Sequence, residues 1–354
     1  MSRFFSSRHA ALTPYVPGEQ PQDKKYIKLN TNESPYAPPQ AVALAASAAS
    51  AICRLYSDPE SAALREALAR RYGLTKEQII VGNGSDEILN FSFMAFGDES
   101  HPLLFPDISY GFYPVFAELN RIPYREIPLE SDFTLDLQPY MEHEGVVVIA
   151  NPNAPTGLSL PLSALEALLR SLTKGLLIVD EAYVDFGGES AVSLINRYDN
   201  LLVVQTFSKS RSLAGARLGY GMGNAELIRD LQTIQYSTNP YNVNRMTAEA
   251  GAVALENQDY FDRCCREIME TREWTAAELK KLGFRVLDSK TNFLFAESDR
   301  IAGEELYRRL KQKGILIRHF TLPRIANFNR ITIGLPEDMR TFILNVKECM
   351  EERA

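Results

Sequence analysis

Four short polar segments carry the residues that could do chemistry, and each follows a run of apolar residues. They are Gly82-Asn-Gly-Ser-Asp-Glu87, Asn151-Pro-Asn-Ala-Pro-Thr-Gly157, Asp180-Glu-Ala-Tyr183, and Thr206-Phe-Ser-Lys209, which is followed by Gly215-Ala-Arg217. In open α/β sheets, ligands bind beyond the carboxyl ends of the strands. We therefore expect the four segments to meet at one site.

The first segment suits a phosphate. Gly84, Ser85 and Asp86 lead into an expected helix, where backbone N–H groups and the helix dipole favour an anion. The segment is neither a dinucleotide fingerprint nor a P-loop. Taken alone, a glycine turn with an Asp cap is the more common explanation of such a segment.

The third and fourth segments suit charged groups. A carboxylate such as Asp180, at the end of a buried strand, is costly unless a cation meets it, although it could also cap the next segment. Lys209 lies just past a buried strand, where burial and the nearby Arg217 favour the neutral amine. The alternative for Lys209 is a solvated loop position.

Together the segments meet the requirements of pyridoxal 5′-phosphate. This cofactor needs an amine for a Schiff base, a carboxylate for the ring nitrogen, donors for the ring hydroxyl and a phosphate cup. The residues that match, in that order, are Lys209; Asp180; Tyr183 with Asn151 or Asn153; and Gly84, Ser85 and Asp86 with Ser208 and Arg217. Lys209 would also serve as the base for a proton shift at the substrate carbon.

A layered α/β domain must position these residues. The apolar runs predict strands that are buried on both faces, at residues 79–81, 103–105, 146–149, 176–179 and 201–204. Helical patterns lie between them, for example Asp86–Phe96 and Pro161–Ser171. Such alternation predicts a mostly parallel sheet covered by helices.

The two ends of the chain have a different pattern. Residues 1–40 are rich in proline and loop-like, whereas Asn242–Leu282 predicts one long helix. An α+β pattern follows, with strands near 284–287, 292–295, 315–317 and 330–333 and helices at Ala302–Lys313 and from Pro336. We predict three parts: 1–40 packing on a small domain, 41–255 as the large cofactor-binding domain, and 256–354 as the small domain.

Composition excludes several classes of protein. The 354 residues contain 38 Lys+Arg and 45 Asp+Glu, a net charge of −7, which argues against a dedicated nucleic-acid binder. No apolar stretch is long enough to span a membrane, and the N-terminus does not resemble a secretory signal. The four cysteines and four histidines show no metal-ligand spacing, so we expect no metal and a cytoplasmic protein.

At this point the sequence resembles the fold-type I pyridoxal-phosphate aminotransferases and, more closely, the histidinol-phosphate aminotransferase family. The resemblance covers nearly the whole chain, through Leu12-Thr-Pro-Tyr15, Leu29-Asn-Thr-Asn-Glu-Ser-Pro35, Tyr56-Ser-Asp-Pro59, the Thr206–Tyr220 region and Arg330-Ile-Thr-Ile-Gly334. It implies a large domain with a mostly parallel seven-stranded sheet and a smaller α+β domain. It also implies a homodimer with shared sites.

The resemblance implies a role for each matching residue. Lys209 would carry the internal aldimine, Asp180 would face the ring nitrogen, Tyr183 would bond the ring oxygen and Tyr110 would stack on the ring. The phosphate would be held by Ser85, Asp86, Thr206, Ser208 and Arg217, and by Tyr56 from the partner subunit. The substrate would meet Tyr15, Asn32, Arg318 and Arg330. Without the resemblance, core packing would explain Tyr110, and a surface ion pair would explain Arg318.

One position departs from the family pattern. The fourth residue of the Asn151–Gly157 loop is Ala154, where the family commonly has an asparagine that donates to the ring oxygen. Either Asn151 or Asn153 would take that role, or Tyr183 would act alone. The loss of one such hydrogen bond is worth roughly 0.5–1.5 kcal/mol, so we expect cofactor binding to survive.

The implied activity is transamination between histidinol phosphate and 2-oxoglutarate, giving imidazole-acetol phosphate and glutamate; histidine biosynthesis runs this step in reverse. Two arginines suit a dianionic phosphate better than a lone carboxylate. Because one lysine serves both half-reactions, we expect ping-pong kinetics. The alternatives are a threonine-phosphate decarboxylase, an aromatic amino-acid aminotransferase, and a cofactor-binding regulator without turnover.

Overall fold

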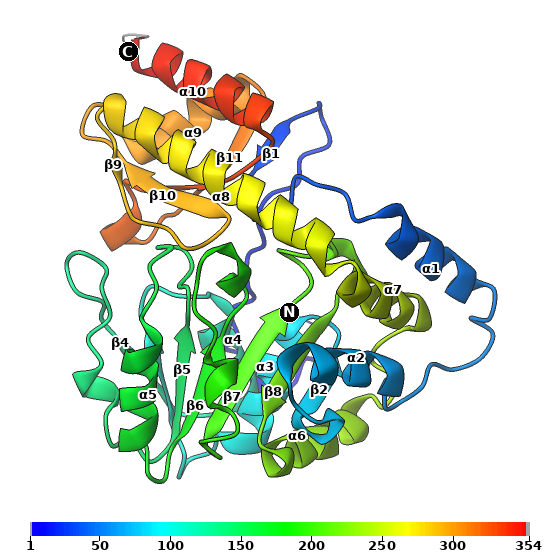
Figure 1. The fold of residues 1–354 in the computed structure, drawn as a ribbon. Helices are drawn as coiled ribbons and strands as arrows, with labels where there is room; N and C mark the ends of the chain where they lie inside the picture. The colour runs from blue at the N-terminus through cyan, green and yellow to red at the C-terminus, as the bar shows by residue number, and fades with distance from the viewer. Residues whose placement is uncertain (1, 352–354) are drawn as a thin grey trace.

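Two β-sheets organise the protein, and Figure 1 shows them one above the other. The computed structural model describes residues 2–351. Seven strands form the large sheet and five form the small one. Each sheet has its own hydrophobic core, so the chain contains two layered units rather than one continuous sheet.

The large sheet is mostly parallel, as predicted. Its strand order is β2-β8-β7-β6-β5-β3-β4. Only β8 runs against its neighbours β2 and β7. The bounds are β2 Ile79–Gly82, β3 Leu103–Pro106, β4 Tyr124–Ile127, β5 Val146–Ala150, β6 Leu176–Asp180, β7 Leu201–Thr206 and β8 Gly219–Gly223.

Helices cover both faces of this sheet, which explains why its central strands are apolar throughout. Alternate residues of β5 enter different cores: Val147 and Ile149 face one, Val146 and Val148 the other. One face packs against α2 (Ala62–Tyr72), α5 (Leu162–Ser171) and α7 (Arg245–Glu256). The other packs against α3 (Ser85–Phe96), α4 (Phe112–Asn120) and α6 (Ala225–Thr238).

The small sheet joins the two ends of the chain. Its strands are β1 Ile27–Leu29, β9 Arg285–Val286, β10 Phe293–Glu297, β11 Ile315–His319 and β12 Asn329–Thr332. β1, from the N-terminal segment, pairs in parallel with β11. The helices α8 (Gln258–Lys281), α9 (Gly303–Gln312) and α10 (Pro336–Glu351) contribute to its core.

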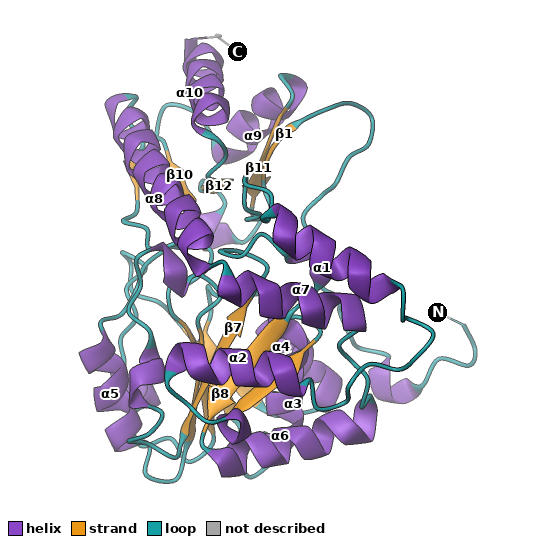
Figure 2. Ribbon diagram, turned by 45° about the vertical axis from the view of Figure 1, so that its right-hand side comes forward, coloured by secondary structure: helices purple, strands orange, loops and turns teal. Residues whose placement is uncertain are grey.

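Residues 242–282 do not form the single helix predicted from their pattern. The chain makes α7 and α8 and breaks between them at Asn257, whose side chain bonds the carbonyl of Val253. An asparagine that bonds nearby backbone competes with helix continuation. α8 then runs from α7 toward the small sheet (Figure 1). The remaining helix, α1 (Gln40–Ser50), lies beside α7 (Figure 2).

Three strands were not predicted: β1, which lies within residues 1–40 that were expected to be loop-like, and β4 and β8, which lack the apolar pattern used for the others. β4 is a sheet edge with the sequence Tyr-Arg-Glu-Ile, and β8 is Gly-Tyr-Gly-Met-Gly. An edge strand tolerates charged side chains, and glycine weakens strand propensity. Within residues 2–351, no helix has both the length and the apolar character that membrane crossing requires.

Candidate active site

A cavity of about 470 Å³ lies where β5, β6 and β7 end. Its volume falls within the usual range for small-molecule sites. Most of the predicted cofactor residues line it: Ser85, Asp86, Tyr110, Asp180, Tyr183, Thr206, Ser208, Lys209 and Arg217. The structure therefore brings together residues that lie up to 132 positions apart in the chain, from Ser85 to Arg217.

Asp180, the last residue of β6, is buried and paired with a tyrosine. Tyr113 Oη donates to Asp180 Oδ2 at 2.8 Å, and the Ala182 amide donates to Oδ1 at 3.2 Å. Burial raises the pKa of Asp180 to about 6, although the Tyr113 hydroxyl and the Ala182 amide favour the ionised form. Sequence reasoning did not single out Tyr113, which lies three residues after Tyr110 in the same aromatic segment.

Lys209 and Tyr183 lie together at the cavity. Lys209 Nζ is 5.6 Å from the centre of the Tyr183 ring and 3.5 Å from the Thr31 carbonyl oxygen. The Tyr183 hydroxyl accepts a hydrogen bond from Asn32 Nδ2 at 2.9 Å. Since that hydroxyl already accepts from Asn32, its own proton remains available to a partner in the cavity.

The glycine segment and Arg217 form the opposite end of the cavity. Gly84 has a φ of +85°, and a Cβ there would lie 2.6 Å from Arg217 Nη2, so only glycine fits. α3 begins at the next residue, Ser85. Arg217 Nη2 pairs with Asp86 Oδ2 at 2.9 Å, and Tyr110 Oη donates to Asp86 Oδ1 at 2.7 Å. This end offers a helix N-terminus, a guanidinium and hydroxyl groups.

Two of those hydroxyls lie at the end of β7: Thr206 is its last residue, and Ser208 follows two residues later. The Thr206 hydroxyl donates to Ser208 Oγ at 2.9 Å and accepts from the Ser208 amide at 3.1 Å. Both side chains are buried. The short turn thereby fixes the direction of the Ser208 hydroxyl and leads directly into Lys209.

The amides of Asn151 and Asn153 hold their own loop instead of lining the cavity. Asn151 Oδ1 accepts from the Leu160 amide at 2.8 Å, and its Nδ2 donates to the Leu160 carbonyl. Asn153 Nδ2 donates to Ile108 and Thr156. Ala154, by contrast, lines the cavity with its methyl group. On this side the loop presents no side-chain amide to a ligand.

Arg318 and Arg330 are cross-strand partners in the small sheet. The antiparallel register of β11 and β12 sets them directly opposite, so both side chains lie on the same face. Both guanidinium groups lie near the Phe320 ring, at 5.7 Å and 5.9 Å from its centre. Burial lowers the pKa of Arg330, and its Nε lacks a partner among the described residues. A buried donor without a partner is poised for an anion.

The other predicted substrate residues come from the N-terminal segment. Tyr15 stacks on Phe112 with ring centres 4.2 Å apart and lies 6.4 Å from Tyr110. Asn32 is buried, with a φ of +57°, and bonds Thr332 through its amide and its side chain. Tyr56 is far more open: it is 79% exposed and stacks on Tyr241.

Comparison with known proteins assigns this arrangement to a family. Residues 24–345 match the class I and II aminotransferases. The chain belongs to that family. It is 44% identical to histidinol-phosphate aminotransferase of Clostridium botulinum (strain Kyoto / Type A2), over 99% of this chain and 100% of the relative. It is 49% identical to that of Marinomonas sp. (strain MWYL1), over 98% and 99%.

Solved aminotransferase structures agree with this assignment. Histidinol-phosphate aminotransferase from Sinorhizobium meliloti, in complex with pyridoxal-5′-phosphate, superposes with a TM-score of 0.90 at 25% identity and covers 99% of this chain and 98% of its own. That from Clostridium acetobutylicum gives 0.84 at 25% identity, over 92% and 99%. The predicted fold-type I aminotransferase fold and the predicted family are therefore confirmed.

The residues of this aminotransferase cavity fit pyridoxal phosphate. The fit rests on chemistry at its two ends: a buried carboxylate at Asp180, and the Gly84–Ser85 helix start with Arg217 at the other end. A Cβ at Gly219 would lie 2.2 Å from the Ser85 amide nitrogen, so the strand and the helix start are already as close as glycine permits. Among residues 2–351, no cluster of His, Cys, Asp and Glu is arranged to hold a metal.

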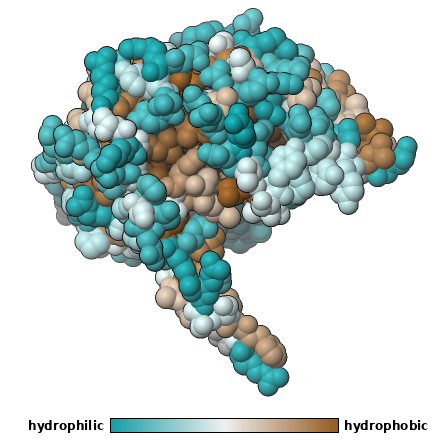
Figure 3. Space-filling model, turned by 90° about the horizontal axis from the view of Figure 1, so that it is seen from below, coloured by the Kyte–Doolittle hydropathy of each residue, from teal (hydrophilic) through white to brown (hydrophobic). Residues whose placement is uncertain are grey.

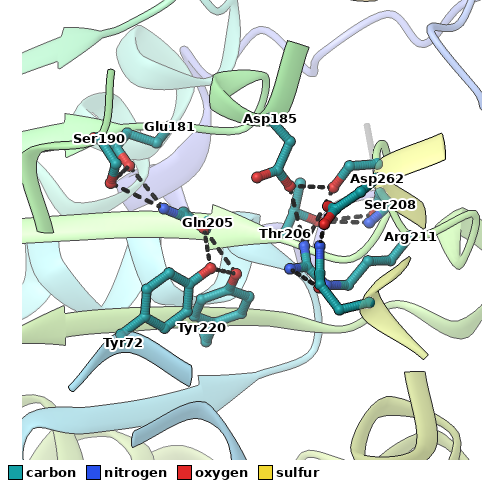
Figure 4. Close-up of polar contacts among 12 residues, drawn as sticks. Tyr72, Glu181, Asp185, Ser190, Gln205, Thr206, Ser208, Arg211, Tyr220 and Asp262 are labelled. Carbon is teal, nitrogen blue, oxygen red and sulfur yellow. Dashed lines mark hydrogen bonds and ion pairs between the residues drawn. The ribbon is translucent and has the colours of Figure 1, made fainter. Parts of the chain in front are cut away.

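A buried polar layer lies beside the Lys209 segment (Figure 4). Glu181, next to Asp180, accepts from Ser190, the Ala191 amide and Gln205. Gln205 in turn accepts from Tyr72 and Tyr220 at 2.8 Å each. Burial raises the pKa of Glu181 to about 7, against these donors. This network fixes β6, which ends at Asp180, and β7, which ends three residues before Lys209.

A second cluster in Figure 4 holds Arg211, which lies two residues after Lys209. Arg211 is fully buried and pairs with Asp185 at 3.1 Å, and Ser210 bonds the same carboxylate. Arg211 also donates to Gln258, the first residue of α8. The lysine loop is therefore tied to the helix that leads to the small sheet.

Proposed function

We propose that this protein is a pyridoxal-phosphate-dependent transaminase that converts histidinol phosphate and 2-oxoglutarate to imidazole-acetol phosphate and glutamate, with biosynthesis running in reverse. The observation that carries this proposal is the full-length similarity, at 43–49% identity, to histidinol-phosphate aminotransferases. The paired arginines support the same substrate class: the Arg330 guanidinium lies 5.4 Å from the centre of the Phe293 ring, which packs edge-on against Tyr183 of the cavity.

The proposed cofactor contacts follow the chemistry of the cavity. Asp180 would face the ring nitrogen, Tyr110 would stack on the ring and Tyr183 would donate to the ring oxygen. The phosphate would replace the Asp86 carboxylate as the main partner of Arg217, and the backbone N–H groups of Ser85 and Asp86 and the hydroxyls of Thr206 and Ser208 would also donate to it. When bound, the cofactor supplies a conjugated ring that accepts the electron pair left by a departing proton.

Lys209 is the proposed acid–base residue. Its Nζ lies at the cavity, 5.6 Å from the centre of the Tyr183 ring. It would remove the Cα proton and return it during the exchange of the amino group. Because the same lysine serves both half-reactions, the kinetics should be ping-pong.

Arg318 and Arg330 are the proposed anion contacts of the substrate. Two guanidinium groups on one sheet face can each offer a pair of donors, which suits the three oxygens of a phosphate ester. Glutamate would present its side-chain carboxylate to the same arginines. Tyr15, close to Tyr110, and Asn32, beside Tyr183, would bound this part of the pocket.

We further propose a cytoplasmic homodimer. An exposed apolar patch supports the dimer: it spans α1, the turn that follows it, and α7, and comprises Leu44, Ile52, Leu55, Tyr56, Tyr241 and Met246. Phe4 and Phe5 are also exposed on the N-terminal segment, and Figure 3 shows an arm that projects from the rest of the molecule. Contiguous exposed apolar residues commonly mark an interaction surface. Tyr56 would then reach the phosphate of the partner's cofactor. Cys53, Cys264 and Cys265 form no disulfide among the described residues, which is consistent with a reducing compartment.

A panel of amino donors tests the substrate. Purified enzyme loaded with pyridoxal phosphate is mixed with histidinol phosphate, phenylalanine or glutamate, and the change in cofactor absorbance is followed. We expect histidinol phosphate and glutamate to convert the cofactor with the highest kcat/KM. A large preference for phenylalanine would identify an aromatic aminotransferase instead.

The same material separates the remaining alternatives. A threonine-phosphate decarboxylase would release carbon dioxide from threonine phosphate without an amino acceptor. Formation of glutamate from 2-oxoglutarate, without gas evolution, supports the transaminase. A protein that binds the cofactor but shows no spectral change with any donor would be a non-catalytic member of the fold.

A further inference from the structure

Three carboxylates line the cavity, and one of them has no role in the chemistry described so far. Asp180 is buried against Tyr113, and Asp86 pairs with Arg217. The third is Glu33, in the N-terminal segment. An acidic side chain is unexpected in a pocket that must accept glutamate and a phosphate ester, so its presence calls for a physical reason.

Glu33 is held in its ionised form and in a fixed position. Lys28 Nζ donates to Oε1 at 2.7 Å and to Oε2 at 2.6 Å, and the Thr31 hydroxyl donates to Oε2 at 2.8 Å. Burial alone would raise the pKa of Glu33, but these donors outweigh it and lower the pKa. A carboxylate has about four lone-pair positions, so Oε1 retains one for a ligand.

The position of Glu33 relative to Lys209 matters for what it can reach. The Thr31 carbonyl oxygen lies 3.5 Å from Lys209 Nζ, and the hydroxyl of the same threonine contacts Glu33. Lys209 marks the place of the reacting carbon. Thr31 therefore contacts both residues, and all three line the same cavity, so a ligand next to Lys209 lies in the same pocket as the Glu33 carboxylate.

Histidinol phosphate carries two groups on short arms from its amine-bearing carbon. Its phosphate suits the two arginines, and its imidazole presents a ring N–H donor that needs an acceptor. We propose that Glu33 recognises this imidazole, with its carboxylate accepting a hydrogen bond from the ring N–H. The proposal rests on the proposed function and names the residue that would set its substrate choice.

The same carboxylate would discriminate between substrates. It repels carboxylates and so disfavours glutamate, whose carboxylates are better placed near Arg318 and Arg330. It offers nothing to the phenyl ring of phenylalanine, which has no donor and leaves the carboxylate without a ligand. Glu33 would therefore favour histidinol phosphate over aromatic amino acids.

Substitution of Glu33 by glutamine tests the proposal, with kcat and KM measured for histidinol phosphate and for phenylalanine. We expect Glu33→Gln to lower the ratio of the two kcat/KM values by roughly tenfold, the scale of a hydrogen bond to a charged group. The loss should lie mainly in KM for histidinol phosphate, and a spectral titration should give a matching rise in its Kd. An unchanged ratio, or an equal loss for both substrates, overturns the proposal.

Two variants separate recognition from a structural role. Glu19→Gln is the matched control. Glu19 also lies on the N-terminal segment and pairs with a lysine, Lys311, but it does not line the cavity. Lys28→Met removes the ion pair and leaves the Glu33 carboxylate in place. Glu19→Gln should keep the selectivity of the wild type, whereas Lys28→Met, which loosens the carboxylate but retains it, should lose clearly less selectivity than Glu33→Gln. If Lys28→Met loses selectivity as Glu33→Gln does, Glu33 acts only through the ion pair and the proposal fails.

The wild-type measurement distinguishes the two levels of inference. Wild-type protein that transaminates phenylalanine but not histidinol phosphate contradicts the proposed function and this proposal with it. Wild-type protein that prefers histidinol phosphate, together with a Glu33→Gln variant of equal preference, contradicts only the role of Glu33. Cofactor absorbance and melting temperature, recorded for every variant, show whether the fold and the cofactor site are intact.

Discussion

Asp180 ends β6 where an ionised carboxylate is costly, and the Tyr113 hydroxyl reduces that cost. Burial raises the pKa of Asp180 to about 6, and the hydrogen bond from Tyr113 is the strongest influence in the opposite direction. A carboxylate that faces a ring nitrogen is most useful when ionised. Tyr113 is therefore a positioning residue that acts through Asp180.

Tyr113→Phe should weaken cofactor binding. Without the hydroxyl, Asp180 loses a hydrogen bond to a charged group, worth roughly 1.5–3 kcal/mol, and its pKa rises further. We expect the Kd for pyridoxal phosphate, measured by absorbance titration, to rise at least tenfold. Tyr140→Phe is the matched control, because the buried Tyr140 hydroxyl has no partner among the described residues. Equal Kd values for the two variants would exclude the role assigned to Tyr113.

Glu181 should make stability depend on pH. Burial raises its folded-state pKa to about 7 from an ordinary value of 4.5, so the folded protein binds a proton that the unfolded chain has released. Binding of this proton by Glu181 therefore stabilises the folded state. The stabilisation is fully present below the unfolded-state pKa of Glu181 and is lost as pH rises through its folded-state pKa. Between pH 5 and pH 8 we expect it to fall by about 2 kcal/mol.

Urea unfolding of wild type and Glu181→Gln at both pH values measures that change. The free energy of unfolding of the wild type, minus that of the variant, should be larger at pH 5 than at pH 8. The variant also disturbs the bonds from Ser190 and Gln205, but that cost is the same at each pH and cancels in the comparison. A difference that is constant with pH would mean that Glu181 stays ionised in the folded protein.

At the scale of elements, β8 shows how a strand can serve a ligand site. It pairs with β2 through Gly82 and Gly219 and with β7 through Thr206 and Gly219. The missing side chain at Gly219 lets the start of α3 approach the strand, where a Cβ would lie 2.2 Å from the Ser85 nitrogen. The phosphate end of the cavity depends on this close approach.

Gly219→Ala should therefore damage both stability and cofactor binding. Moving β8 away from α3 is an overpacking change that costs roughly 1–3 kcal/mol, and it displaces Ser85 from the cavity. We expect a lower free energy of unfolding and at least a tenfold rise in the Kd for pyridoxal phosphate. Gly215→Ala is the control for stability, since a Cβ there meets nothing within 4 Å and its backbone is not left-handed; because Gly215 also lines the cavity, it is not used as a control for affinity. Wild-type affinity in Gly219→Ala would contradict this account.

Sequence alone predicted the elements whose signal is local. β5, β6 and β7 are apolar throughout because both faces are covered, and α3 begins where its glycine turn ends. β1, β4 and β8 were missed because they depend on pairing with a distant strand, on an edge position and on a close approach, which are properties of the assembled sheets. The break at Asn257 was missed because the helical pattern continues on both sides of it.

The features of the candidate site also fall into two groups, those that the sequence predicts and those that it does not. Lys209, Asp180 and Arg217 follow predicted strands, so topology alone places them at one edge of the sheet. The partnership of Tyr113 with Asp180, and that of Asn32 with Tyr183, depend on contacts between distant segments. Likewise, only the loop geometry shows that the Asn151 and Asn153 amides are occupied elsewhere. No spacing in the sequence reports such contacts.

At the scale of the whole molecule, Asn32 joins the three parts of the chain. It belongs to the N-terminal segment, bonds Thr332 of the small sheet and accepts at its carbonyl from Asn292, while its side chain reaches Tyr183 beside the large sheet. The proposed donor to the cofactor ring is thereby oriented by residues of the small sheet. Any change in the relative position of the two sheets would therefore shift the Tyr183 hydroxyl.

A shared active site would extend this coupling to a second subunit, and hybrid dimers test it. Lys209→Ala lacks the proposed base, and Tyr56→Phe lacks the proposed phosphate contact, so each homodimer should have low activity at limiting cofactor. If Tyr56 serves the partner's site, a hybrid dimer has one site with both residues intact. Random mixing of equal amounts then restores about a quarter of the sites. If Tyr56 serves its own subunit, mixing restores none, and a monomeric mass by light scattering would contradict the dimer itself.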